Sequence, residues 1–250
     1  MREYQDGTPP GTIAVPTSGV PRYHEFWLSL NALEVPAGTR LALCASCDVV
    51  ANWNTIIREQ FTGDWLWMMG DDHVFNPDIL RRLLAHHVDV VAPLTPRKRE
   101  PYLPVVWKDL NPDTGKFSLY SWHEISDFDG LTTVAGVGNA GMLVTRRVLD
   151  AIGDPWLKSG RLTTANLTED TWFCWEATQR GFPIFVDPSL LMGHLATVAL
   201  WPGHDADGRL HIVGNIGNVE RVLMKAYNPR RPLEVPHRTL AEQYHEGALR

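Results

Sequence analysis

Short apolar runs alternate with longer amphipathic segments along the first 94 residues of the chain. The runs with the length of strands are 12–16, 40–45, 64–69 and 88–94, and the segments with helical character are 23–33, 54–61 and 76–87. Strands that alternate with helices in this way are typical of βαβ units. The pattern therefore predicts an α/β fold with a mostly parallel, Rossmann-like central sheet flanked by helices.

The third of these helices carries its own start signals. Asn76 is suited to cap it, Pro77 suits the first helical position, and Asp78 stands near the positive end of the helix dipole. We expect this helix to reach about His87 and to lead into the strand at 88–94.

The alternation stops after residue 94. Residues 95–131 contain several prolines and a hairpin-like stretch, in which 104–107 and 116–122 flank a turn. Such a long excursion is typical of a lid or a binding insert over a sheet. Regular elements then resume with a strand within 136–145, helices at 146–152 and 169–180, and strands at 183–186 and 190–195.

The C-terminal part of the sequence mixes loops with two segments of helical character, 218–226 and 239–249. We expect residues 1–200 to form one domain. Residues 201–250 are predicted to form an arm that packs on the same domain.

Composition narrows the class of protein. The chain has 250 residues, of which 44% are hydrophobic and 21% charged, and its formal net charge is −6. Proteins that grip a nucleic-acid backbone usually carry a basic surplus, so this charge disfavours such a role. No run approaches the roughly 18 apolar residues of a membrane span, and residues 1–11 lack the apolar core of a secretory signal. We therefore expect a cytoplasmic protein.

Cys44 and Cys47 form a C-x-x-C pair. This pair is compatible with a zinc or a redox site, but no second C-x-x-C or H-x-x-H follows it. Because Cys44 also lies within an apolar run, buried structural thiols are the favoured interpretation.

The third strand ends abruptly at Gly70-Asp71-Asp72-His73. Adjacent carboxylates at the end of a buried strand are unfavourable unless a positive charge compensates them, and in open α/β sheets this edge is where ligands bind. Hard oxygen ligands there suit Mg²⁺ or Mn²⁺, which would neutralise a diphosphate. Asp71 and Asp72, with His73 beside them, are thus candidates for a metal–diphosphate site. A plain surface turn has the same composition, so the motif alone leaves both interpretations open.

This arrangement resembles the GT-A glycosyltransferases, in particular the family-2-like group, over roughly residues 10–200. In that family a helix bearing an Asn, then a Gly and an apolar strand precede an Asp-x-Asp motif that binds metal and nucleotide sugar. Asn54, Gly63 and Trp65–Met69 match the parts that precede the motif.

The acidic motif itself departs from the family pattern. Gly70 stands where the first Asp normally stands, and Asp72 stands where the last one does. The resemblance implies Asp72 as the principal metal ligand, with Asp71 near the metal's waters or the ribose.

The second half of the family's site is matched further along the chain. Thr168-Glu169-Asp170 begins a helix and is similar to the acidic Glu-Asp motif, whose Asp is the catalytic base in inverting members. The same residues are also what helix capping and the helix dipole favour. His194 follows the next strand and occupies the place of a third metal ligand. Neutral imidazole is more compatible with Mn²⁺ than with Mg²⁺, so Mn²⁺ is the preferred ion.

A glycine-rich segment, Gly136-Val137-Gly138-Asn139-Ala140-Gly141, matches G-x-G-x-x-G. A dinucleotide fingerprint would open a long helix early in a βαβ unit, whereas this segment lies mid-chain and leads into a strand-like run. In the family a Gly-rich turn here approaches the donor sugar, which implies that role for residues 138–141. The resemblance also implies nucleotide contacts near the first two strands, at Pro16, Thr17, Ser46 and Asp48.

The motifs occur in the family's order, and this order favours a metal-dependent glycosyltransferase. The implied donor is a nucleoside-diphosphate sugar, with a UDP-sugar favoured, and inversion is favoured over retention. Short proteins of this kind occur in bacteria and phages, where hydroxyl acceptors include envelope glycans, proteins and hydroxymethylated DNA bases. A catalytically degenerate sugar-binding or assembly protein is the alternative that Gly70 supports. A sugar nucleotidyltransferase is disfavoured because 16–22 is a poor match to its Gly-rich, Arg-containing loop.

Overall fold

The computed structural model describes residues 1–17, 23–46, 48–98, 101–162, 165–197, 199–204, 210–216 and 219–224. These residues belong to two compact units. The first unit contains 1–97 and 102–195, and the second contains 98–101 and 196–250. Within the described ranges, no helix combines the length and the apolar character needed to cross a bilayer.

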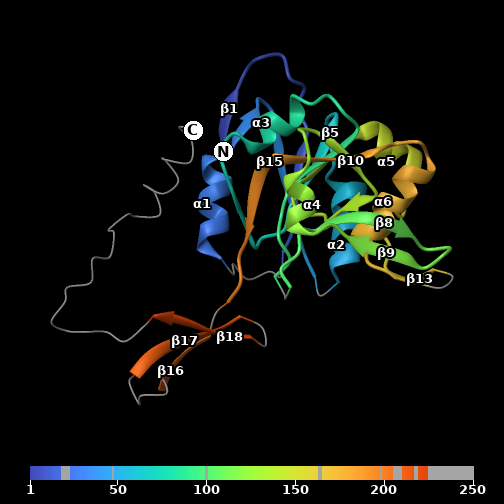
Figure 1. Ribbon diagram of the computed structural model, residues 1–250. Helices are drawn as coiled ribbons and strands as arrows, with labels where there is room; N and C mark the ends of the chain where they lie inside the picture. The colour runs from blue at the N-terminus through green and yellow to red at the C-terminus, as the bar shows by residue number, and fades with distance from the viewer. Residues whose placement is uncertain are drawn as a thin grey trace. The chain divides into compact units, whose positions relative to one another are not determined.

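A central sheet organises the first unit (Figure 1). Its strand order is β10 (Thr132–Val134), β15 (Ile184–His194), β7 (Val90–Leu94), β12 (Met142–Thr145), β5 (Trp65–Met68), β2 (Thr12–Thr17) and β4 (Arg40–Ala45), with β6 (His73–Phe75) pairing β15 off this path. Strands β2, β4 and β5 are mutually parallel, as are β7 and β15, whereas β12 and β10 run antiparallel to their neighbours. The predicted α/β fold with a mostly parallel sheet is confirmed.

Helices cover both faces of this sheet because successive strand residues point to opposite sides. On β2, Ile13 and Val15 belong to one buried cluster, and Ala14 between them belongs to the other. The first cluster contains residues of α1 (His24–Ala32) and α3 (Ile79–Leu84), and the second contains residues of α2 (Val49–Glu59), α5 (Arg146–Ile152) and α6 (Glu169–Gln179). The result is a three-layer arrangement.

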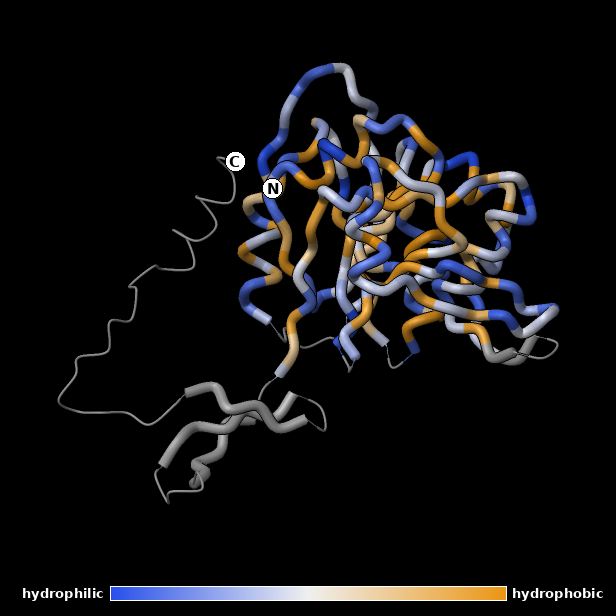
Figure 2. Tube along the Cα trace, viewed as in Figure 1, coloured by the Kyte–Doolittle hydropathy of each residue, from blue (hydrophilic) through white to orange (hydrophobic). Residues whose placement is uncertain are grey.

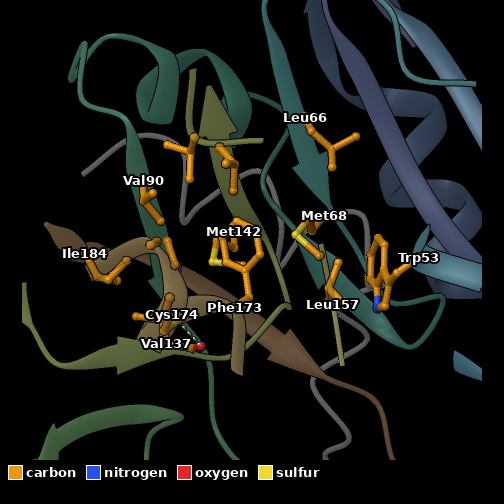
Figure 3. Packing of buried hydrophobic residues seen from close by; sticks show 14 of the residues in the cluster. Trp53, Leu66, Met68, Val90, Val137, Met142, Leu157, Phe173, Cys174 and Ile184 are labelled. Carbon is orange, nitrogen blue, oxygen red and sulfur yellow. Dashed lines mark hydrogen bonds between the residues drawn. The ribbon is translucent and has the colours of Figure 1, made fainter. Parts of the chain in front are cut away.

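The second cluster is the larger apolar core (Figure 3). Trp53 on α2 and Phe173 on α6 are both almost fully buried in it. Phe173 reaches the core from α6, while Cys174 on the same helix exchanges hydrogen bonds with the backbone of Val137 at 3.4 Å. Along the tube of this unit, hydrophobic positions concentrate on the central strands (Figure 2). The core therefore ties α6 to the sheet and to the glycine-rich segment.

Smaller elements surround the sheet. The predicted insert contains a hairpin, as expected, but also a short helix that the sequence did not suggest. Its elements are β8 (Val106–Asn111), β9 (Lys116–Leu119) and α4 (Trp122–Ser126), and β8 also pairs β11 (Gly136–Val137). Two further pairs are β1 (Arg2–Tyr4) with β3 (Glu34–Pro36), and β13 (Gly160–Leu162) with β14 (Ala165–Leu167).

Several elements of the first unit differ from the prediction. Helix α2, expected at 54–61, begins five residues earlier and spans Val49–Glu59. The helix expected to start at Asn76 is shorter, since α3 spans only Ile79–Leu84 and its N-cap residue is Asp78. The preceding residues form a turn in which Ile79 donates to the carbonyl of Asn76 at 3.2 Å. The strands expected at 183–186 and 190–195 are one strand, β15, with a register shift between Asp187 and Leu191.

The second unit contains an antiparallel three-stranded sheet. Its strands are β16 (Ala199–His204), β17 (Leu210–Ile216) and β18 (Val219–Met224). The helix predicted at 218–226 is therefore wrong for Val219–Met224. Two β-branched residues, Val219 and Val222, favour a strand there, and pairing with β17 supplies the backbone partners. The helix predicted at 239–249 lies outside the described residues.

Candidate functional site

The sequence-predicted site residues gather at one edge of the central sheet. Strands β2, β4, β5, β7 and β15 point the same way, so their carboxyl ends meet at that edge. Residues at or just beyond these ends are Thr17, Ser46, Asp71, Asp72, Pro96 and His194. The carboxyl edge of an open α/β sheet is the usual ligand-binding edge.

Asp72, His73 and His194 form a compact cluster there. One potential ligand atom from each lies within 4.8 Å of the others. The two imidazole rings stack, with centroids 4.2 Å apart and an interplanar angle of 21°. Antiparallel pairing of β6 and β15 places His73 directly opposite His194, and Leu195 donates its backbone N–H to the carbonyl of Asp72 at 2.8 Å. The backbone of both strands therefore fixes the cluster.

The orientation of His194 indicates a cation site. Its Nδ1 lies 2.9 Å from the carbonyl oxygen of Pro96, which can only accept, so Nδ1 carries a proton. The other ring nitrogen, Nε2, faces Oδ2 of Asp72 at 3.7 Å. An imidazole nitrogen and a carboxylate oxygen that face each other can both serve as ligands of one divalent cation. Bonding of the second ring nitrogen to a carbonyl is also how metal-ligating histidines are held.

His73 joins the two predicted metal ligands, Asp72 and His194, in this cluster. Its side chain is only 5% exposed, and burial is the main cause that lowers its pKa, against the opposing hydrogen bond with Asp72. The ring is therefore neutral at pH 7. Among the described residues, its buried Nε2 has no hydrogen-bond partner. The carboxylate of Asp72 and the imidazole of His194, which lie beside this buried ring, are donors that fit a divalent transition metal.

Asp71 lies on the same connection between β5 and β6. It is only 2% exposed, so it belongs to the buried side of the cluster rather than to a surface turn. The plain surface turn that the sequence left open is therefore excluded for Asp71 and His73. The contact of Asp71 with metal-bound water or ribose stays a prediction.

The glycine-rich segment connects the two predicted halves of the site. At one end, Gly141 donates its N–H to the carbonyl of Met68, the last residue of β5, at 2.8 Å. At the other end, a Cβ on Gly138 would lie 3.7 Å from Oδ2 of Asp170. Asn139 and Ala140 lie between them and are partly buried. The segment forms a turn into β12 and no long helix follows it, which agrees with the rejection of a dinucleotide fingerprint.

Glu169 and Asp170 open α6, whose N-cap residue is Thr168, as predicted. Asp170 accepts hydrogen bonds from the Thr168 hydroxyl and, at 2.8 Å, from the backbone N–H of Thr171. Burial nevertheless raises the pKa of Asp170. Burial also raises the pKa of Glu169, and the charges of Asp170 and Asp48 add to this effect. Carboxylates with raised pKa values hold a proton more tightly and are better bases at neutral pH.

The predicted nucleotide contacts occupy the far end of the same edge. Pro16 and Thr17 pair in register with Cys44 and Ala45, so the ends of β2 and β4 lie side by side. Ser46 and Asp48 follow β4, where both are exposed. Asp48 also caps α2, accepting from the N–H of Ala51 at 3.0 Å. The binding roles of these four residues stay predictions.

Asn54 has a structural function in addition to its predicted one. Its Nδ2 donates to the carbonyls of Val50 at 3.0 Å and Leu157 at 2.8 Å, and its Oδ1 accepts from the N–H of Leu157 at 3.1 Å. Asn54 therefore clamps the segment around Leu157 to α2. A nucleotide contact by Asn54 would have only the second lone pair of Oδ1 available.

Of the C-x-x-C pair, only Cys44 lies in the described part of the chain. It is half-buried and its Sγ donates to Oδ1 of Asn52 at 3.3 Å. This contact agrees with the interpretation of Cys44 as a structural thiol. Cys47 lies outside the described residues, as does Arg22, which the nucleotidyltransferase alternative involves.

A cavity of about 550 Å³ lies away from this edge. Its lining includes Asp64 and Trp65 at the start of β5 and Thr145 at the end of the antiparallel β12. It thus opens at the amino ends of the parallel strands, opposite the acidic cluster. We attach no catalytic role to it.

Comparison with known proteins supports the fold assignment. No family model and no curated protein sequence matches the chain. Among solved structures, the chain matches GalNAc-T7, solved with UDP, GalNAc and Mn²⁺, at a TM-score of 0.51 and 8% identity. The fold is GT-A-like. The match covers 77% of this chain and 45% of GalNAc-T7, so the chain spans less than half of that protein.

Two further solved structures resemble the chain more distantly. Protein A197 from STIV matches over 91% of this chain and 100% of its own length, with 16% identity and a TM-score of 0.47. The first 349 residues of S. aureus TarS match over 76% of this chain and 61% of their own length, with 13% identity and a TM-score of 0.39. At these scores and identities, neither adds an argument about function.

Proposed function

We propose that the protein is a metal-dependent glycosyltransferase that moves a sugar from a nucleoside-diphosphate donor to a hydroxyl acceptor. The observation that carries this proposal is the Asp72–His73–His194 cluster at the carboxyl edge of a GT-A-like sheet. One end of the glycine turn at 138–141 lies beside Asp170, the base candidate, and the other end is bonded to Met68 at the end of β5, the strand that leads to Asp72. A cation site and a carboxylate base on either side of a backbone turn are the parts that glycosyl transfer needs.

Asp72 and His194 would hold the ion, which we propose to be Mn²⁺ or, less favourably, Mg²⁺. When bound, the ion would neutralise the negative charge that develops on the departing diphosphate. Oxygen and imidazole donors together suit Mn²⁺ better than Mg²⁺, which prefers oxygen ligands and retains its waters.

Asp170 would act as the base of an inverting reaction. As the acceptor oxygen forms its bond to the anomeric carbon, the bond from that carbon to the diphosphate oxygen breaks and its electron pair leaves with the diphosphate. The acceptor proton passes to the carboxylate of Asp170. Burial, which raises the pKa of Asp170, favours this proton uptake.

The donor is proposed to be a UDP-sugar, held by the ends of β2 and β4 on one side and by the glycine turn on the other. The acceptor is proposed to be an envelope glycan, a protein, or a hydroxymethylated base in phage DNA. The net charge of −6 disfavours the DNA acceptor relative to the other two.

Thermal unfolding tests the proposal directly. Nucleoside diphosphates and nucleotide sugars are added singly, with Mn²⁺ or with a chelator, and a ligand that binds the folded state raises the melting temperature. We expect a shift with a uridine nucleotide that requires Mn²⁺. In Asp72→Ala this metal-dependent shift should disappear, with Asp129→Ala as a matched exposed control. If Asp72→Ala keeps the full metal-dependent shift in melting temperature, Asp72 is not part of the site.

A catalytically degenerate sugar-binding protein remains the second candidate, because Gly70 replaces the first acid of the family motif. Hydrolysis of the bound donor in the presence of Mn²⁺ separates the two. Slow release of the free sugar would support the enzyme, and tight donor binding without any turnover would support the binding protein.

A further inference from the structure

The Nδ1 atom of His73 lies between two acceptors. It is 2.8 Å from Oδ1 of Asp72 and 3.3 Å from the carbonyl oxygen of Gly70. Because both neighbours are hydrogen-bond acceptors, Nδ1 of His73 carries a proton. His73 therefore donates to Oδ1 of Asp72, while the other oxygen, Oδ2, faces Nε2 of His194 at 3.7 Å.

Glycine at position 70 is what makes room for this hydrogen bond. A Cβ added there would lie 2.8 Å from Oδ1 of Asp72 and 3.0 Å from Nδ1 of His73. Real Cβ atoms essentially never approach other heavy atoms closer than 3.0 Å. A side chain at position 70 would therefore force the carboxylate of Asp72 or the ring of His73 to shift from the observed contact.

The rings and strands hold His73 in this position. Its imidazole stacks on that of His194, and the register of β6 against β15 places the two residues opposite each other. With Oδ1 held by His73, rotation of the Asp72 carboxylate is restricted and Oδ2 stays directed toward His194. A carboxylate that is already oriented loses less entropy when it binds an ion.

We propose that His73 is a positioning residue, which replaces the missing acid at position 70 by orienting Asp72 for a divalent cation. The inference rests on the proposed metal dependence of the site. It implies that the site binds its metal without an acid at position 70, and that Gly70 is not the sign of an Asp-x-Asp motif that has lost its function.

The test measures Mn²⁺ binding alone, without nucleotide, by calorimetry and by electron paramagnetic resonance on the full chain. His73→Ala should weaken Mn²⁺ binding by about 10- to 100-fold, the usual effect of losing a group that orients a ligand. His73→Asn should restore most of the affinity, because the Asn amide nitrogen occupies the place of Nδ1. His73→Gln, which instead places its amide near Nε2, should bind as weakly as His73→Ala.

The opposite ranking overturns the inference. Strong binding by His73→Gln and weak binding by His73→Asn would make Nε2 of His73 a direct ligand. The exposed His123 on α4 provides a matched control, since His123→Ala removes an imidazole outside the cluster and should leave Mn²⁺ affinity unchanged.

Substitution of Gly70 gives an independent readout. Gly70→Asp recreates the acidic pattern of the family, yet we expect it to weaken Mn²⁺ binding, and Gly70→Ala should do the same through the Cβ alone. Tighter binding by Gly70→Asp would overturn the inference and support a decayed motif. Absence of Mn²⁺ binding by the wild-type protein would instead contradict the proposed metal dependence itself, so the two failures are distinguishable.

Discussion

The carboxyl group of Asp170 illustrates how a helix start combines structure and chemistry. The Thr168 hydroxyl and the Thr171 N–H both donate to it, which on their own would lower its pKa. Burial outweighs these hydrogen bonds and raises the pKa. The helix-capping interpretation and the catalytic one are therefore compatible, since the same contacts that begin α6 also orient the base.

Replacement of this carboxylate separates binding from chemistry. In Asp170→Asn the amide keeps the shape of the side chain but cannot accept the acceptor proton. We expect transfer to fall by about 10²- to 10⁴-fold, the usual contribution of a general base, with the donor-induced rise in melting temperature intact. Product formation from labelled donor measures the rate of transfer, and thermal unfolding measures donor binding. Transfer within a few-fold of wild type would exclude Asp170 as the base, and the exposed Asp129→Asn serves as control.

The raised pKa of Asp170 also predicts how stability depends on pH. An acid whose folded-state pKa exceeds its ordinary value of 3.8 binds its proton more tightly when folded. Its contribution to stability is therefore present at low pH and is lost as the pH rises through the folded-state pKa. At pH 7 to 8, Asp170→Asn should be more stable than wild type by about 0.5–2 kcal/mol. This gain should vanish below the ordinary pKa. Urea unfolding between pH 3 and 8 tests it, and a gain that is the same at every pH would contradict it.

At the scale of elements, the turn that leads into β12 depends on a glycine. Gly141 has a φ of +76°, and a Cβ there would lie 2.7 Å from both Cε of Met192 and Cγ of Pro93. Gly153 at the end of α5 has a nearly equal φ of +74° but open space around it. The pair thus separates backbone strain from crowding.

We expect Gly153→Ala to cost about 1–3 kcal/mol from its backbone conformation alone, since φ 74° with ψ 167° is a region that side chains rarely adopt. Gly141→Ala should cost roughly 1–3 kcal/mol more, because the side chains of β7 and β15 must also move. Chemical denaturation of the two variants gives the comparison. If both variants lose the same free energy of unfolding, the turn tolerates a Cβ at position 141 and crowding against Met192 does not destabilise the protein.

Local signals in the sequence located some elements and missed others for identifiable reasons. Helix α5 matches its predicted range, 146–152, because an apolar periodic segment ends at Gly153. Strand β15 was predicted as two strands because Asp187 interrupts the apolar run. In the structure, Asp187 accepts from the N–H and hydroxyl of Ser189, and pairing with β7 resumes at Leu191. The irregularity at Asp187 is therefore a bulge within one strand. The strand continues past it because β15 pairs with β7 on both sides, and this pairing is a tertiary contact that the local sequence does not show.

In the candidate site, too, some features could be predicted from local sequence and others depend on tertiary contacts. Asp72, Asp170 and His194 could be proposed as candidates from the sequence because each follows or begins an element whose pattern is strong. The role of His73 was not predicted, because it depends on which strand β6 pairs with and on the space left by Gly70. Likewise, the N–H of Gly141 reaches Met68 across 73 residues of sequence, and no local pattern encodes that contact.

At the scale of the whole molecule, the first unit contains everything that the proposed chemistry needs. Both apolar clusters consist of residues up to Leu195, and Asp72, Asp170 and His194 all belong to the same unit. The order of the sheet explains why Asp72 and His194 lie together. Five strands with a common direction bring residues from 16 to 194 to one edge, although they are dispersed along the chain.

The boundary at residue 200 stays a prediction and can be tested by truncation. A chain of residues 1–200 retains both cores, so we expect cooperative unfolding with a melting temperature within about 4 °C of the full chain, equivalent to roughly 1–2 kcal/mol. Because the metal cluster is retained, Mn²⁺ and nucleotide should still raise that temperature. A chain ending at residue 180 is the matched control, since it lacks β15 and with it His194, and should not fold. If the 1–200 chain unfolds without cooperativity, then residues 201–250 are part of the folding unit and the boundary is wrong. If it folds but no longer responds to Mn²⁺ and nucleotide, the C-terminal residues contribute directly to the binding of the donor.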